Sequence, residues 1–116
     1  MVKQDILKEE LLFEVEDIFG KKVRITKRYW EEIKTRKHTE LEFEMDDIIG
    51  TLAEPDEVRL SVQDAYIRLF FKQFDEAILI VVVKYLNGNG FVVTVYQTSK
   101  VKRKGEIVWS RKPQRI

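Results

Sequence analysis

The stretch Ala77–Thr98, AILIVVVKYLNGNGFVVTVYQT, decides the fold because its pattern is that of two β-strands joined by a turn. Its first half, Ile78–Val83, is apolar without interruption, which is typical of a strand buried on both faces. Two Asn-Gly pairs follow, and Asn-Gly is a strong signal for a β-hairpin turn. The second half alternates, so that Thr94, Tyr96 and Thr98 share one face of their strand. The stretch predicts a hairpin with a row of hydroxyl groups along one side.

The length and composition indicate one globular domain. A chain of 116 residues is long enough for a single hydrophobic core, and 44% hydrophobic against 35% charged residues is the balance of a folded domain. There is no cysteine and only one histidine, which excludes disulfides and zinc sites made of thiolates or several histidines. No apolar segment approaches the roughly 20 residues that cross a bilayer, and the first ten residues lack the apolar core of a signal peptide. We therefore expect a single domain over residues 1–116, without cofactor or membrane partner, in the cytoplasm.

Charge is segregated along the chain although the net charge is only +1. Two basic segments, Lys21–His38 and Lys100–Ile116, flank the segment Thr39–Glu57, which contains acidic but no basic residues. If the fold brings the basic segments to one side, the protein has a positive surface suited to phosphate groups. The alternative is an ordinary solvated surface on which the two signs are interspersed.

Two helices and a series of strands are predicted around the hairpin. Thr26 is a suitable N-cap for a helix that ends near Lys37, and the spacing of Met45, Ile48, Ile49 and Leu52 predicts a second helix with one apolar stripe. Four strands joined by short connections follow, and they predict an antiparallel meander: Val58–Val62, Tyr66–Phe74, Ala77–Leu86 and Phe91–Thr98. Shorter runs predict an edge hairpin at Leu11–Val15 and Lys22–Thr26 and an added strand at Ile107–Trp109. A short helix is expected within Met1–Glu10, and a frayed end from Arg111 to Ile116. Helices followed by consecutive strands favour the α+β class, with the N-terminal helices packed on one face of a twisted antiparallel sheet.

The turns give an expected register for the sheet. With Asn87–Gly90 as the loop, Leu86 pairs with Phe91, and with Asp75 and Glu76 as the preceding turn, Phe74 pairs with Ala77. One face of the sheet then carries five polar side chains suited to an anion or a phosphate: Arg68, Lys72, Thr94, Tyr96 and Thr98. The other face is expected to meet the helices through Ile67, Leu69, Phe71, Ile78, Ile80, Val82, Val93 and Val95. A solvated sheet face, polar only for solubility, is the alternative.

Seven short segments, taken together and in order, resemble the phage-associated nuclease-like family, which is grouped with barnase, EndoU, colicin ribonuclease domains and RelE. They extend over residues 24–109: Arg24–Trp30 (RITKRYW), Lys37–Glu40 (KHTE), Glu54–Val58 (EPDEV), Arg68–Lys72 (RLFFK), Val81–Lys84 (VVVK), Phe91–Thr98 (FVVTVYQT) and Gly105–Trp109 (GEIVW). The resemblance implies a barnase- or RelE-like fold and a metal-independent endoribonuclease activity on the concave face of the sheet. It also implies RNA as a ligand, and an inhibitor or antitoxin protein as a possible partner.

Cleavage of RNA by attack of a 2′-hydroxyl on the adjacent phosphate needs a base, an acid and stabilisation of negative charge. His38 is the first choice as acid or base, because its ordinary pKa lies near neutrality, and Glu40 is a possible partner base in contact with substrate. Arg68 and Lys72 would hold the phosphate, while Tyr96, Thr94 and Thr98 would orient it or relay a proton. A non-catalytic nucleic-acid-binding module and a protein-interaction domain are the alternatives.

Overall fold

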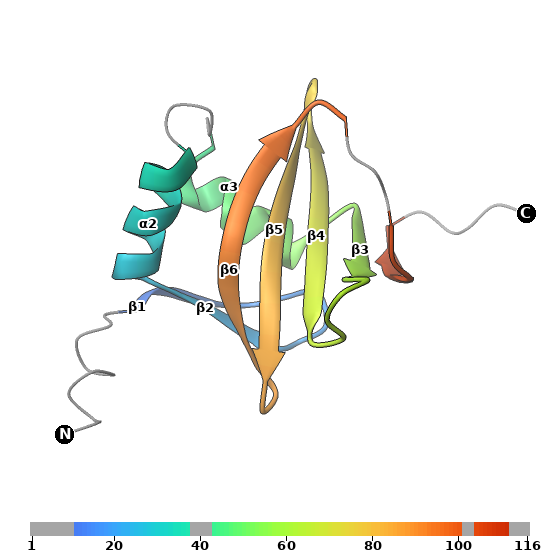
Figure 1. Cartoon of the computed structure of the whole chain (residues 1–116), viewed down its shortest axis with the longest axis horizontal. Helices are drawn as coiled ribbons and strands as arrows, with labels where there is room; N and C mark the ends of the chain where they lie inside the picture. Colours follow the sequence, from blue (N-terminus) through green and yellow to red (C-terminus); the bar gives the residue numbers. More distant parts are fainter. Residues whose placement is uncertain (1–10, 38–42, 101–103, 112–116) are drawn as a thin grey trace, which may run out of the picture.

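The computed structural model describes residues 11–37, 43–100 and 104–111. Seven strands form one sheet in the order β1-β2-β6-β5-β4-β3-β7 (Figure 1). The strands are β1 (Leu11–Glu16), β2 (Lys22–Thr26), β3 (Glu57–Leu60), β4 (Ile67–Phe74), β5 (Ala77–Leu86), β6 (Asn89–Thr98) and β7 (Ile107–Ser110), and the helices are α2 (Lys27–Lys37) and α3 (Met45–Ala53). None of the helices in these ranges is both long enough and apolar enough to pass through a bilayer. The predicted helix within Met1–Glu10 lies outside the described residues.

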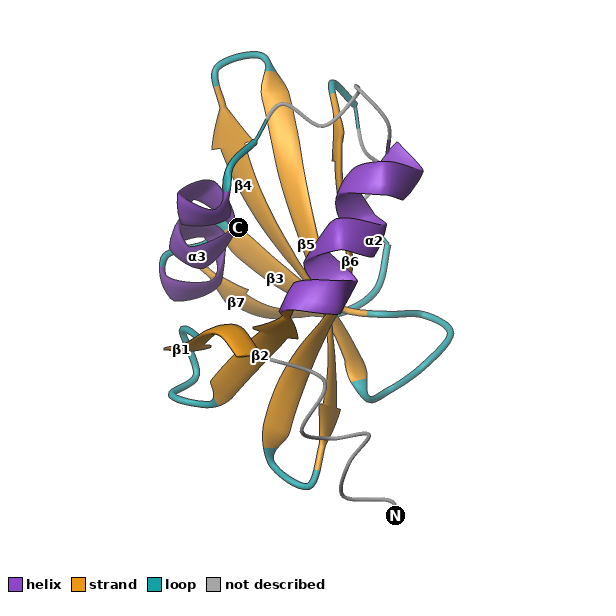
Figure 2. Cartoon of the chain, turned by 90° about the vertical axis from the view of Figure 1, so that its left-hand side faces the viewer, coloured by secondary structure: helices purple, strands orange, loops and turns teal. Residues whose placement is uncertain are grey.

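The expected fold class is wrong. The expectation was an α+β fold with N-terminal helices packed on one face of a twisted antiparallel sheet, as in barnase and RelE. The structure is instead dominated by a mixed sheet, because β2 pairs in parallel with the start of β6 while the neighbouring strands pair antiparallel. The described chain begins with the β1–β2 hairpin, and its two helices are short, with eleven and nine residues. In the view of Figure 2, this hairpin lies below the two helices. A parallel pair between distant segments leaves no local pattern, so the sequence predicted an edge hairpin without showing where it docks.

Local signals predicted the helices and the meander correctly. The amide of Tyr29 donates to the Thr26 hydroxyl at 3.2 Å, so Thr26 caps α2 as expected. Ile48 and Leu52 are buried on α3, whose start is closed by a capping box between Glu44 and Asp47. The strands β3, β4, β5 and β6 follow one another as an antiparallel meander, and β7 pairs with β3. Phe74 pairs with Ala77 across the β4–β5 turn, as the sequence predicted.

The register of the β5–β6 hairpin differs from the expected one by two residues at the turn and by one residue from the Val82–Thr94 pair onward. Asn87 and Gly88, with φ of 56° and 84°, form the whole turn, so that Leu86 pairs with Asn89. Both angles are positive, as the tight turn favoured in hairpins requires. The second Asn-Gly pair belongs to β6 itself. A β-bulge follows, because Val83 pairs with Val92 while Val82 pairs with Thr94, which leaves Val93 as the extra residue.

Gly90 explains why the second Asn-Gly pair is not a turn. It pairs with Tyr85 on one side and with Val23 of β2 on the other. A β-carbon at Gly90 would lie 2.8 Å from Val83 Cγ1, 3.0 Å from Tyr85 Cε2 and 3.1 Å from Val23 Cγ2. This glycine therefore allows β2 to approach the meander closely, which is a packing requirement and not a turn requirement.

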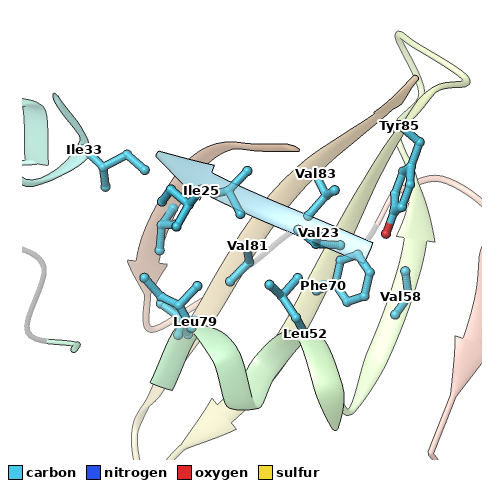
Figure 3. Close-up of a cluster of buried hydrophobic side chains, with 13 residues drawn as sticks. Val23, Ile25, Ile33, Leu52, Val58, Phe70, Leu79, Val81, Val83 and Tyr85 are labelled. Carbon is cyan, nitrogen blue, oxygen red and sulfur yellow. The ribbon is translucent and has the colours of Figure 1, made fainter. Parts of the chain in front are cut away.

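The main core lies on the opposite face of β4 and β5 from the one expected. The main core contains Phe70, Leu79, Val81 and Val83 of the meander, and these belong to the strand face that was expected to stay open. They pack with side chains of the hairpin and of both helices, which include Val23, Ile25, Ile33, Ile48 and Leu52 (Figure 3). Of the eight residues expected to meet the helices, Val95 belongs to this core, while Phe71, Ile78 and Ile80 form a second buried cluster. β4 and β5 pair with each other as expected, whereas the one-residue shift beyond the bulge places the hydroxyl row of β6 on the opposite face from Phe70, Val81 and Val83.

Candidate functional site

The five polar side chains predicted to form one site are divided between the two faces of the sheet. Arg68 and Lys72 each stand two positions from the core residue Phe70 in β4, so they share its face and lie on the helix side. Thr94, Tyr96 and Thr98 pair with Val82, Ile80 and Ile78, and so lie on the opposite side, which we call the outer face. The predicted grouping is therefore wrong. His38 and Glu40 lie outside the described residues, and their predicted roles stay predictions.

The two cations of the predicted site have structural partners. The guanidinium carbon of Arg68 lies 4.4 Å from the centre of the Phe19 ring and 4.9 Å from that of Tyr85, which is a cation–π arrangement with two rings. Lys72 Nζ donates a hydrogen bond of 2.6 Å to the carbonyl oxygen of Glu54, at the end of α3. A cation at this position stabilises the negative end of the helix dipole. Both side chains hold elements of the fold together.

Tyr85 connects this region to the turn of the β1–β2 hairpin. Its hydroxyl donates to Asp17 Oδ2 at 2.5 Å, and Asp17 Oδ1 accepts from the amides of Phe19 and Lys21 at 2.8 and 2.9 Å. Burial, and then the hydrogen bond to Asp17, raise the pKa of Tyr85 far above its ordinary value. The Ile18 amide also donates to the Leu52 carbonyl oxygen at 3.0 Å. These contacts fasten the hairpin to the meander and to α3.

On the outer face, the predicted hydroxyl row is present but lies beside an apolar cluster. Tyr96 packs against the buried Phe71, Ile78 and Ile80, and burial raises the pKa of its hydroxyl. The Thr98 hydroxyl donates to the Lys100 carbonyl oxygen at 2.5 Å and accepts from the Lys100 amide, so it closes the turn after β6. At neutral pH the Tyr96 hydroxyl is protonated, and it can serve as a hydrogen-bond donor but not as a base.

A groove of about 640 Å³ lies farther along the same face, where β1, β2, β5 and β6 meet the start of α2. We call it the Phe91 groove. Its lining combines apolar side chains with three cations: Leu11, Arg24, Thr26, Arg28, Tyr29, Lys84, Leu86, Phe91 and Val93. Three of the apolar residues are exposed, Leu11 to 53%, Leu86 to 48% and Phe91 to 36%. Exposed apolar side chains gathered around one hollow are typical of a binding site.

The centre of this groove is a row of side chains across the sheet. Lys84 of β5 pairs with Phe91 of β6, and Phe91 pairs with Arg24 of β2. Neighbouring strands lie about 4.8 Å apart, so the backbones of the two cations are roughly 10 Å apart with the aromatic residue between them. The parallel pairing of β2 with β6 creates this arrangement.

Both cations of the row already form ion pairs, but these pairs are weak. Arg24 Nε lies 2.6 Å from Glu14 Oε2, and Lys84 Nζ lies 3.5 Å from Asp64 Oδ2. All four side chains are about one third exposed to water. Such pairs contribute about 0–1 kcal/mol, so an anion in the groove can replace either carboxylate at little cost. The arrangement suits a ligand with a planar apolar part and negative charge on either side.

The groove residues were not singled out as a site from the sequence. Arg24 and Arg28 belong to the basic segment that predicted a phosphate-binding surface, and Lys84 stands in the apolar run of β5. Only the β2–β6 pairing brings Arg24 beside Phe91, and no spacing along the chain reveals that pairing. Among the residues that the structure describes, no three or more acidic, histidine or cysteine side chains are grouped so as to hold a metal ion.

Comparison with known proteins gave no match to a family model, to a curated protein or to a solved structure.

Proposed function

We propose that this protein binds single-stranded RNA in the Phe91 groove. The observation that carries the proposal is the Lys84–Phe91–Arg24 row, which places an exposed aromatic ring between two cations. Proteins that bind single strands combine cations, which follow the phosphates, with aromatic rings on which bases stack. Arg28 adds a third cation to the lining, and Tyr29 adds a second aromatic ring.

RNA is proposed ahead of DNA because of the resemblance of the sequence to the phage-associated nuclease-like family. The segments that carry this resemblance include Arg24–Trp30, Val81–Lys84 and Phe91–Thr98, which supply Arg24, Lys84 and Phe91 to the groove. The cytoplasm remains the proposed location of this activity.

Metal-independent cleavage of RNA is a second candidate function. One observation favours it: the Tyr96 hydroxyl is on the same face as the groove, and a tyrosine hydroxyl is protonated at neutral pH. A protonated hydroxyl can donate to a phosphate oxygen during attack by a 2′-hydroxyl. In this proposal His38 is the acid or base and Glu40 its partner, as the resemblance implies, and Arg68 has no part in the chemistry.

Fluorescence anisotropy of a short labelled single-stranded RNA, measured over a series of salt concentrations in EDTA, tests binding. Each phosphate contact to a single strand contributes about 0.7 to the slope of log K against log salt. The double variant Arg24→Ala with Lys84→Ala should therefore lower the slope by about 1.4. Lys104→Ala is the control for charge, since Lys104 is exposed and precedes β7 at the opposite edge of the sheet.

Gel analysis of the same samples tests cleavage. Cleavage by the wild-type chain that is lost in His38→Ala and weakened in Tyr96→Phe would support the second candidate. Binding without cleavage would leave a nucleic-acid-binding module. The binding proposal fails if the wild-type chain shows no salt-sensitive affinity for the RNA, and a protein partner such as an inhibitor would then be the better explanation of the groove.

A further inference from the structure

We infer that the Phe91 groove is a subsite for one unpaired base, which stacks on the Phe91 ring while the flanking phosphates contact Arg24 and Lys84. The inference rests on the proposed function and adds the form of the ligand: a nucleotide whose base is not paired. A purely electrostatic surface would follow the phosphates and leave the bases in water. The composition of the groove argues against that simpler mode of binding.

The exposed apolar side chains of the groove favour a base as its ligand. Phe91, Leu11 and Leu86 border the groove and remain in water to a large extent. An RNA bound only through its phosphates would gain nothing from them. A base offers a flat apolar surface of the kind that these side chains can cover, and each base stacked on an aromatic ring contributes appreciably to affinity in single-strand-binding proteins.

The Phe91 ring is carried by a rigid part of the sheet. The backbone of Phe91 is paired on both sides, with Lys84 of β5 and with Arg24 of β2. The β-bulge that follows adds Val93 to the lining of the groove, which is a common role of bulges beside functional sites. A stacking platform held between two strands is preorganised, so little entropy is lost when a base binds.

The shape and size of the groove suit one unpaired base. In a duplex, both faces of a base are covered by its neighbours and its edge is paired, so its face cannot rest on Phe91. A base within a flexible single strand can turn into the groove. The volume of about 640 Å³ lies within the range of about 300–1,000 Å³ found for sites that enclose small ligands, which suits one nucleotide and not a stack of several.

Two probes of equal charge separate stacking from phosphate binding. One is a short single-stranded RNA, and the other is a chain of the same length in which every nucleotide is abasic. We expect the RNA to bind about 5- to 150-fold more tightly than the abasic chain, which corresponds to one stacked base. Double-stranded RNA of the same sequence should compete poorly with the single strand.

The matched variants are Phe91→Leu, which keeps apolar bulk but removes the ring, and Tyr66→Ala, which removes an aromatic residue that is 64% exposed and does not line the groove. Phe91→Leu should lose a similar factor for the RNA, with its salt slope unchanged and its affinity for the abasic chain unchanged. Tyr66→Ala should bind like the wild-type chain. Circular dichroism and thermal melting verify that both variants are folded.

The outcomes separate this inference from the proposed function. If the wild-type chain binds RNA but binds the abasic chain equally well, or if Phe91→Leu keeps full affinity, the base subsite is wrong and RNA binding through phosphates stands. If the wild-type chain binds neither probe, the inference and the proposed function are both wrong. Strong competition by the duplex would likewise overturn the requirement for an unpaired base.

Discussion

Replacing Gly90 with alanine tests the contact on which the fold and the groove both depend. The new methyl group would lie 2.8–3.1 Å from side-chain carbons of Val83, Tyr85 and Val23. Val83 and Val23 are fully buried, and the Tyr85 ring is held by its hydrogen bond to Asp17, so none of the three can move away freely. Overpacking of this kind costs about 1–3 kcal/mol. The lower entropy of the unfolded alanine chain offsets about 0.4–1 kcal/mol, which leaves a net loss of roughly 1–2 kcal/mol.

Gly50→Ala is the matched control, because it makes the same chemical change without crowding. Gly50 lies within α3, and a β-carbon there meets no atom within 4 Å. Alanine is favoured over glycine in a helix interior by about 0.8–1.0 kcal/mol, so this variant should be more stable than the wild-type chain. Urea unfolding followed by circular dichroism gives both free energies of unfolding. A Gly90→Ala chain as stable as the wild type would show that β2 does not lie against Gly90, and the Lys84–Phe91–Arg24 row would be lost with that pairing.

Two further predictions concern single side chains of the fold. Above pH about 10 the unfolded chain releases the Tyr85 proton while the folded chain retains it, so stability should fall as pH rises, by about 1.4 kcal/mol per pH unit for this group. Urea unfolding at a series of pH values should show a shallower fall for Tyr85→Phe, and equal slopes would contradict the assignment. Thr26→Ala should lower the free energy of unfolding by about 0.5–2 kcal/mol, because it removes the cap of α2. Thr26→Asn should restore most of that loss, and failure of both variants to change stability would show that the cap contributes nothing.

Short-range signals account for the parts of the fold that were predicted correctly. The Thr26 cap, the apolar stripe of Ile48 and Leu52, and the two-residue turn between Phe74 and Ala77 are each determined by residues close together in the chain. Each element was therefore found near its observed position. The fold class was wrong because it depends on where the β1–β2 hairpin docks, which is a contact between distant segments.

The predicted site failed because of an ambiguity in the hairpin. Two Asn-Gly pairs stand in succession, and the sequence does not show that only Asn87 and Gly88 turn while Gly90 makes room for Val23. The β-bulge at Val93 is equally hidden. Because the register beyond the bulge differs by one residue from the expected one, Arg68 and Tyr96 lie on opposite faces of the sheet. The basic segment that contains Arg24 was the signal closest to the observed groove, but its partner Phe91 could not be identified from spacing alone.

The parallel pair between β2 and β6 also has a consequence for how the chain acquires its structure. The pairs of the meander join strands that are neighbours in sequence, whereas the β2–β6 pair joins the start of the described chain to a strand near its end. Closing so long a loop costs entropy before any contact compensates for it, so such pairs form slowly. During translation, Arg24 leaves the ribosome long before Phe91 does. We therefore expect the β1–β2 hairpin to dock only after the meander has formed. The groove then forms only after the meander, and refolding followed by RNA binding would lag behind refolding followed by circular dichroism.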